Sequence, residues 1–282
     1  MTENPAASLS PAYTEDEPLL RIEAVSKSYA SGASARLILR KVSAVIRDIH
    51  RQGEVTGQIV GFLGGSGVGK STLLRILAGL ESPSSGRVVL DNQTQPVRAG
   101  QVGVVAQNYP LFAHRTVWGN LMLAARKAQK SEQVVVQYLT DFDLLDCREK
   151  YPAQLSGGQR QRTAILQQVI CGTSFILYDE PFSGLDPIAK RKTEILIQCI
   201  ANLSEISTAV IVTHDVRSAI AISDHLWLLG RDHATDGTVI PGAYIKESIN
   251  LIAMGLAWHP EIREMKEFAE AVVEIERKFQ TL

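Results

Sequence analysis

The run GGSGVGKS at residues 64–71 is the feature that most constrains the fold of this chain. The apolar stretch QIVGFL at residues 58–63 is typical of a buried strand, and residues 70–80 have the apolar periodicity of a helix. Glycines let the backbone curl so that its N–H groups converge, and the start of a helix attracts anions. The spacing fits G-x-x-x-x-G-K-[ST], so we predict a strand–loop–helix unit that cradles phosphate groups.

Each position of this loop has an expected role. Lys70 supplies a point charge to the β- and γ-phosphate oxygens, and the Ser71 hydroxyl is suited to ligate Mg²⁺. The alternative is a glycine-rich turn with a solvated lysine. We expect the following residues to bind nucleotide: Gly64, Gly65, Ser66, Gly67, Val68, Gly69, Lys70, Ser71 and Thr72.

Two carboxylates follow a second apolar run. Residues 175–178 read FILY and end in Asp179 and Glu180. A strand buried on both faces that ends in carboxylates places them at the ligand edge of the sheet. Asp179 suits the Mg²⁺ shell, and Glu180 could accept a proton from an attacking water. Alone, the pair could equally be a polar loop, but the phosphate loop favours the catalytic interpretation.

Composition and charge narrow the classes of protein. Apolar residues make up 45% of the 282 residues and charged residues 21%, the balance of a globular chain. The 29 basic residues are matched by 30 acidic ones, which argues against a nucleic-acid partner. Three scattered cysteines argue against a disulfide framework or a zinc site. The start lacks the pattern of a secretory signal, and the apolar run at 251–258 is shorter than the roughly 20 residues that span a bilayer.

The alternation of apolar runs with helical segments predicts an α/β fold. We expect a sheet with helices on both faces, a loose tail at residues 1–18, a helical subdomain at about 110–160 and a helical extension without strands at 238–282. The expected strands are the stretches 20–24, 37–45, 58–63, 102–105, 175–178, 209–212 and 226–229.

The sequence LSGGQRQR at residues 155–162 is specific to one family. Ser156 is a good helix N-cap, and the two glycines after it leave backbone N–H groups bare, so this is a second anion site. The run resembles the signature sequence of ABC-type ATPases. The resemblance implies a head-to-tail dimer that encloses two ATP molecules, in which the γ-phosphate held by one protomer meets the other protomer's Ser156, Gly157, Gly158 and Gln159.

Four further motifs resemble the same family. Tyr29 stands where an aromatic ring stacks on adenine, although a Tyr there could simply be a packing residue. Gln107 is similar to the glutamine that touches Mg²⁺, so the expected metal ligands are Ser71, Gln107 and Asp179. Residues 183–186 resemble the loop that couples the two sites. His214 is similar to the histidine that contacts the γ-phosphate, although a lone His is more often a satisfied polar group.

The resemblance implies a P-loop NTPase fold over residues 19–237, of the ABC-type ATPase class, with a mixed sheet, a helical subdomain and a short helical extension. The expected catalytic residues are Lys70, Glu180 and His214, with ATP and Mg²⁺ as cofactors. One uninterrupted ATPase domain without a basic stripe or heptad array favours a transporter subunit over a soluble ABC ATPase.

Within transporters, the sequence resembles ATPases of nitrate, sulfonate and taurine importers. The alternative is an exporter or a lipid-trafficking system. The implied partners are a second copy or a homologous ATPase subunit, a transmembrane permease and a solute-binding protein, but no nucleic acid. Such a subunit works peripherally, at the cytoplasmic face of the cell membrane.

Three segments depart from the family pattern or allow two interpretations. The stretch 42–56 is longer than the usual connection into the phosphate-loop strand. Trp118, Leu121 and Met122 are either apolar anchors for a permease or core residues. An apolar stripe near the chain end either packs on the chain's own ATPase domain or on the segment 244–258, or it forms a dimer-stabilising or regulatory helix. The stripe consists of Ile262, Met265, Phe268, Val272, Ile275 and Phe279.

Overall fold

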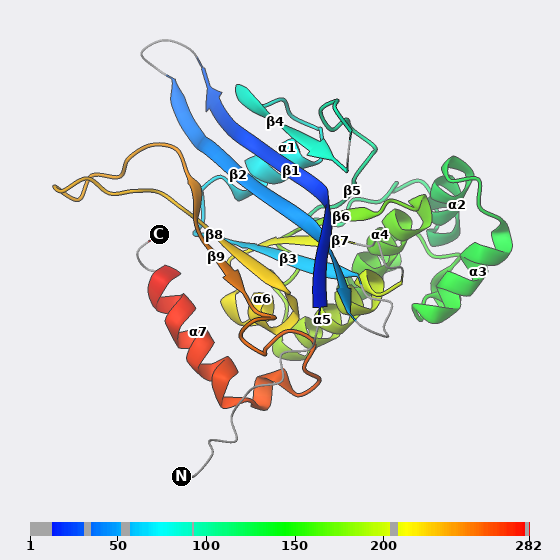
Figure 1. Ribbon diagram of the computed structural model, residues 1–282. Coiled ribbons are helices and arrows are strands. Elements are labelled where there is room, and N and C mark those ends of the chain that lie inside the picture. Colours follow the sequence, from blue (N-terminus) through cyan, green and yellow to red (C-terminus); the bar gives the residue numbers. More distant parts are fainter. Residues whose placement is uncertain (1–12, 31–34, 52–56, 92, 204–207, 280–281) are drawn as a thin grey trace, which may run out of the picture.

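The computed structural model describes residues 13–30, 35–51, 57–91, 93–203, 208–279 and 282 (Figure 1). The strands are β1 (Tyr13–Tyr29), β2 (Arg36–Arg51), β3 (Gln58–Leu63), β4 (Ser85–Leu90), β5 (Gly103–Val105), β6 (Phe175–Asp179), β7 (Thr208–Thr213), β8 (His225–Gly230) and β9 (Tyr244–Asn250). The helices are α1 (Lys70–Leu77), α2 (Val117–Lys127), α3 (Glu132–Asp141), α4 (Gly157–Cys171), α5 (Pro187–Ala201), α6 (Val216–Ile222) and α7 (Lys266–Phe279), with short 3₁₀ turns η2 (Leu145–Cys147), η3 (Pro152–Gln154) and η4 (Ile262–Glu264).

The central sheet is mixed, as expected. Its strand order is β5-β6-β7-β3-β8-β9, in which β3 pairs in parallel with both β7 and β8. All six residues of β3 and of β7 are buried, which accounts for their unbroken apolar runs. Because β3, β6, β7 and β8 are parallel, their carboxyl ends meet at one edge of the sheet, where ligands bind in open α/β sheets.

One face of this sheet is covered mainly by other strands, whereas helices were expected on both faces. A second, antiparallel sheet of order β2-β1-β4 lies over it together with α1. The alternating side chains Val60 and Phe62 of β3 point into this layer and pack in one cluster with Leu20 of β1 and Leu39 of β2. The expectation of helices on both faces is therefore wrong for this face, because long-range strand pairing supplies most of the cover.

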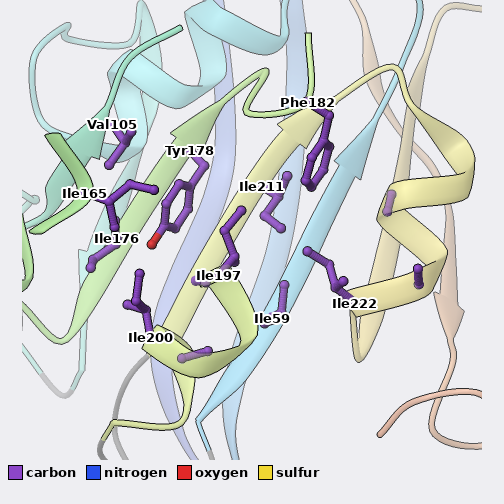
Figure 2. Close-up of a cluster of buried hydrophobic side chains, with 14 of the residues drawn as sticks. Ile59, Val105, Ile165, Ile176, Tyr178, Phe182, Ile197, Ile200, Ile211 and Ile222 are labelled. Carbon is purple, nitrogen blue, oxygen red and sulfur yellow. The ribbon is translucent and has the colours of Figure 1, made fainter. Parts of the chain in front are cut away.

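Helices cover the opposite face. Ile59 and Ile211 of the sheet pack there with Ile197 of α5 and Ile222 of α6, as Figure 2 shows. Figure 1 places α2, α3 and α4 together at one end of the molecule, away from β9 and α7. These three helices and the turns η2 and η3 occupy the region expected to be helical at about 110–160. Within the described ranges, no helix is long and apolar enough to cross a bilayer.

Two expected boundaries are wrong. Residues 13–18, assigned to a loose tail, lie in β1, where Tyr13 pairs with Arg51 and Glu15 with Ile49 of β2. Residues 42–51 of the long stretch 42–56 therefore belong to β2 and extend its hairpin with β1. Residues 1–12 and 52–56 lie outside the described residues. The extension 238–282 contains β9, which pairs antiparallel with β8 and places Ile249 against the core.

The apolar stripe of the C-terminal segment packs on the protein's own ATPase domain. Phe268, Val272 and Ile275 of α7 are buried in the cluster that also contains Ala219 of α6. Val273, on the other side of α7, is 67% exposed. The first of the two interpretations, a helix that covers the domain, is therefore confirmed.

Candidate active site

The phosphate loop lies at the edge of the sheet where β3 ends and α1 begins. Gly67 and Gly69 have φ angles of 72° and 119°, in the region that favours glycine. A Cβ at Gly64 would lie 2.8 Å from the Leu229 carbonyl oxygen, so β8 approaches the start of the loop closely. The local sequence therefore folds as predicted, because both flanking elements and the loop are contiguous in the chain.

The Lys70 side chain folds back onto the loop and binds its backbone. Its ammonium donates to the carbonyl oxygens of Gly64 and Gly65, at 2.8 and 3.2 Å, and lies 3.2 Å from Glu180 Oε1. Its side chain is 7% exposed. The ammonium is buried and its acceptors are two carbonyl oxygens and one carboxylate. It can exchange these acceptors for phosphate oxygens, which accept hydrogen bonds in the same way and bear more negative charge.

Ser71 and Asp179 come together from two different elements. Ser71, in the first turn of α1, donates its hydroxyl to Asp179 Oδ1 at 3.3 Å. Burial raises the pKa of Asp179, with a smaller contribution from the neighbouring Glu180 charge. Hydroxyl and carboxylate oxygens fit Mg²⁺, which is held by one or two carboxylates together with the substrate's phosphates. The described residues contain no group of three or more His, Cys, Asp or Glu side chains that could hold a metal alone.

Glu180 is held in one orientation by the end of β7. Its Oε2 accepts from the Thr213 hydroxyl at 3.1 Å and from the His214 backbone N–H at 3.3 Å, and it lies 2.9 Å from His214 Nδ1. The backbone of Glu180 has a φ of 49°, a strained conformation for a residue other than glycine, and its N–H donates to Val212. This turn directs the carboxylate toward Lys70 and His214.

The same neighbours control the charge of Glu180. Burial acts to raise the pKa of this carboxyl, but the hydrogen bond with His214 and the charge of Lys70 outweigh it, so its pKa is lowered. Glu180 is therefore ionised at neutral pH. An oriented carboxylate with 14% of its side chain exposed can accept a proton from a water molecule at the mouth of the loop.

Gln107 lies at the same sheet edge, with its side chain against the 183–186 loop. It follows β5, whose Val105 pairs with Tyr178 of β6. Its Nε2 donates to Ser183 Oγ at 3.3 Å. The structure thus brings together Ser71 and Asp179, while among the described contacts none joins Gln107 to either of them. The metal-binding role of Gln107 stays a prediction.

Tyr29 is held by a charged network at the end of β1. Its hydroxyl donates to Glu81 Oε1 at 2.6 Å, while Lys27 and Arg75 lie 2.9 Å from the same carboxylate. Burial acts to raise the pKa of Glu81, but these three partners lower it to about 2. Tyr29 is 40% exposed, so its ring is accessible for stacking while its hydroxyl is fixed.

The LSGGQRQR segment forms the start of α4 as predicted. Ser156 caps the helix by accepting from the Gln159 N–H at 3.2 Å, and the Gln159 side chain accepts from the Ser156 N–H at 3.0 Å. A Cβ at Gly157 would meet nothing within 4 Å, so this backbone faces open space. Among the described contacts, no hydrogen bond joins residues 156–159 to the phosphate loop of the same chain.

Sequence reasoning missed three residues that support the site. Thr213 orients Glu180, Glu81 holds Tyr29, and Arg231 donates to the Gly67 carbonyl. A weak signal existed for Thr213, a polar residue at the end of an apolar run and directly before His214. The other two depend on contacts between distant parts of the chain.

Comparison with known proteins identifies close similarities. The family model described as ABC transporter matches residues 55–183. The uncharacterized ABC transporter ATP-binding protein YtlC of Bacillus subtilis is 36% identical over 221 residues, which cover 77% of this chain and 81% of that protein. The sulfate/thiosulfate import ATP-binding protein CysA of Pectobacterium atrosepticum is 37% identical over 62% of this chain and 56% of its own length.

Solved structures agree with these relatives. The ATP-binding cassette MJ0796, in a dimeric post-hydrolysis state bound to ADP and phosphate, superposes with a TM-score of 0.66 at 26% identity, covering 83% of this chain and 99% of that one. The chain spans 66%, 54% and 56% of the relatives named for import of methionine, spermidine/putrescine and sulfate.

Proposed function

This chain belongs to the ABC transporter family of ATP-binding proteins, and we propose that it hydrolyses ATP with Mg²⁺ as a subunit of a membrane transporter. One observation carries the hydrolytic part of this proposal. Glu180 is held between Lys70 and His214 at the mouth of the phosphate loop. This arrangement supports the assignment of Glu180 as general base, Lys70 as phosphate-binding cation and His214 as orienting residue.

The residues divide the chemistry among them. The loop N–H groups and Lys70 bind and neutralise the β- and γ-phosphates, while Glu180 takes the proton of the water that attacks the γ-phosphate. His214 orients Glu180 through its ring and its backbone N–H, and its hydrogen bond lowers the pKa of that carboxyl. Ser71 and Asp179 would hold Mg²⁺, which when bound supplies positive charge to the phosphate oxygens. Catalysis then consists mainly of positioning and charge neutralisation.

Two variants test the assignment. Glu180→Gln should bind MgATP with nearly the affinity of the wild type and lose hydrolysis by about 10²–10⁴-fold, the contribution of a general base. Lys70→Ala should lose productive nucleotide binding. The matched control is Glu276→Gln on the exposed side of α7. Wild-type turnover in Glu180→Gln, measured as phosphate release with dimerisation permitted, would end the assignment of the base.

We further propose that two copies, or this chain and a homologous subunit, sandwich ATP. Support comes from the bare backbone at Gly157, from the cap at Ser156, and from the absence of described contacts between this segment and its own phosphate loop. A helix start with exposed N–H groups is a ready site for the γ-phosphate of a partner. In this arrangement Ser156, Gly157, Gly158 and Gln159 complete the partner's site.

Dimerisation is measurable by light scattering coupled to size exclusion. Glu180→Gln with MgATP should elute as a dimer, because the bound nucleotide cannot be hydrolysed, and it should be monomeric without nucleotide. Adding Ser156→Arg should abolish the dimer while one-site nucleotide binding remains. An ATP-dependent dimer that persists in the double variant would move the interface away from this segment.

For the membrane side, we propose that the Gln107 loop and the helical region at 116–147 dock a separate permease, so that the protein works peripherally at the cytoplasmic face. Leu121 and Met122 are buried in the core, so they are not the apolar anchors. Trp118 is partly buried against that core, with the Arg148 guanidinium 5.7 Å from its ring centre. Exposed Phe112 is the better anchor. The import names of relatives support solute import, with a solute-binding protein delivering the solute.

Charge reversal tests the docking surface. Arg115 and Arg126 are exposed beside this surface. Arg115→Glu together with Arg126→Glu should weaken membrane recruitment in cells that hold the permease and should leave nucleotide binding unchanged. Arg277→Glu on α7 is the control. Unchanged membrane association of the double variant would place the docking surface elsewhere.

A further inference from the structure

Arg231 follows β8 directly and reaches the phosphate loop from outside. Its Nη2 donates to the Gly67 carbonyl oxygen at 2.8 Å, across 164 positions of sequence. The parallel pairing of Leu63 with Leu228 brings the ends of β3 and β8 together, so the residue after β8 is adjacent to the loop that follows β3. Neither the loop motif nor the signature segment includes this arginine.

The contact determines which way one peptide group of the loop points. The Gly67 carbonyl and the Val68 N–H belong to the same planar peptide and point in opposite directions. Arg231 holds the carbonyl of this peptide, and on its opposite side the Val68 N–H donates to the Gly65 carbonyl oxygen within the loop, at an N–O distance of 3.4 Å. Inward N–H groups are the donors that a phosphate loop offers to its ligand.

The backbone of Arg231 is itself fixed on both sides. Its N–H donates to the carbonyl oxygen of Leu282 at 2.9 Å, and its own carbonyl accepts from Lys246 Nζ at 3.3 Å. A Cβ at Gly230 would lie 2.8 Å from Lys246 Cδ and 2.9 Å from Leu282 Cδ2, so these contacts are tight. The C-terminal segment thus supports the strand end that carries Arg231.

The charge of Arg231 is available to the site. The buried Nε of Arg231 has no hydrogen-bond partner, and none of the ion pairs found among the described residues involves its guanidinium. A cation that is not neutralised by a neighbour adds to the positive field at the loop, and ATP bears several negative charges there. Arg231 can therefore act in two separable ways, as a donor to Gly67 and as a charge.

We propose that Arg231 is a positioning residue for nucleotide binding, which holds the Gly67–Val68 peptide in its phosphate-binding orientation and is supported by the C-terminal segment. This inference rests on the proposed function, because it concerns the affinity of the same loop for ATP. It makes Arg231 act on binding and not on the hydrolytic step, since its contact is with the loop and not with Glu180 or His214.

The test separates the donor from the charge. Arg231→Gln keeps a donor without charge, Arg231→Lys keeps the charge with a shorter reach, and Arg231→Met removes both. The dissociation constant for MgATP should rise about three- to tenfold in Arg231→Met, because this variant loses a partly exposed charge-assisted hydrogen bond. The rise should be smaller in Arg231→Gln and in Arg231→Lys. The turnover number at saturating ATP should stay near that of the wild type. Arg277→Met on exposed α7 is the control.

A second readout does not depend on catalysis. Without nucleotide, amide hydrogen exchange of the peptide that covers residues 64–71 should be faster in Arg231→Met than in the wild type, with the peptides of α5 and β6 unchanged. Equal ATP affinity and equal exchange in a folded Arg231→Met protein would overturn the inference, and so would a loss confined to turnover. A wild-type protein that binds no ATP would overturn the proposed function instead.

Discussion

His214 Nδ1 lies 2.9 Å from Glu180 Oε2, and the backbone N–H of His214 points at the same oxygen. One residue thus holds the carboxylate twice, through its ring and through its main chain. Thr213 adds a third hydrogen bond from the preceding position of the same strand end. The orientation of Glu180 is therefore a property of the end of β7, although Glu180 itself follows β6.

Removing the ring should affect both the rate of hydrolysis and its pH dependence. His214→Ala should lower the turnover number by roughly 10²–10³-fold, the effect of losing one preorganised donor. Because the hydrogen bond with His214 lowers the pKa of Glu180, the variant's carboxyl protonates at a higher pH. The acid limb of residual activity should therefore move to higher pH. A limb at the wild-type position, measured from pH 5 to 8, would contradict this coupling.

Tyr29 should contribute through its ring. Tyr29→Ala should weaken ATP binding by about 5- to 100-fold, the range measured when an aromatic side chain that stacks on a base is truncated. Tyr29→Phe should keep most of the affinity, because the ring stays and only the hydroxyl's hydrogen bonds with Glu81 and Arg75 are lost. Fluorescent nucleotide titration measures both, with inorganic triphosphate as the control ligand. If Tyr29→Ala weakens triphosphate binding as much as ATP binding, the ring does not stack on adenine.

Asp224 should make stability depend on pH in the opposite sense from an ordinary surface carboxylate. Burial raises the pKa of Asp224 to about 7, although its Oδ2 accepts from the Ile59 N–H at 2.6 Å. A folded-state pKa above the unfolded value means that this group's stabilisation is complete below about pH 4 and is lost as the pH rises through 7.

The matched comparison is Asp224→Asn against Asp146→Asn, an exposed aspartate. The free energy of unfolding in urea, measured at pH values from 4 to 8, should fall with pH more steeply in the wild type than in Asp224→Asn. Asp146→Asn should follow the wild type. Parallel curves for Asp224→Asn and the wild type would show that Asp224 is ionised throughout this range.

The C-terminal helix should stabilise the whole domain. Phe268 is 3% exposed in the main core cluster, so Phe268→Ala should cost about 3–5 kcal/mol of unfolding free energy. Val273→Ala on the exposed side of the same helix should cost less than about 0.5 kcal/mol. Thermal unfolding distinguishes them. Similar losses in the two variants would contradict the burial of this stripe.

The parts of the site that were predictable from the sequence are contiguous in the chain. The phosphate loop, its strand and its helix occupy residues 58–77 without interruption, and Asp179 and Glu180 directly follow their apolar run. Short-range glycine and apolar patterns determine such units. By contrast, Arg231 reaches Gly67 across 164 positions, and no local pattern marks an arginine after a strand as a partner of that loop.

The wrong boundaries have the same origin. Residues 244–250 read YIKESIN, in which Ile245 and Ile249 are four apart, a spacing that fits a helix as well as a strand. Because this segment pairs with β8, it forms a strand. Likewise, the acidic residues 13–18 resemble a solvated tail until β2 pairs with them. The role of Leu121 was also undecided from the sequence. Helical periodicity does not distinguish a side chain that packs in the core from one that lies on a docking surface, and the structure buries Leu121.

The ion pair between Lys70 and Glu180 has a consequence for nucleotide binding. Under the proposed function, Glu180 and the phosphates of ATP would use the same ammonium as their counter-ion. Binding of ATP would weaken the hold of Lys70 on the carboxylate, and the proposed base would be freed from that ion pair only when the loop is filled.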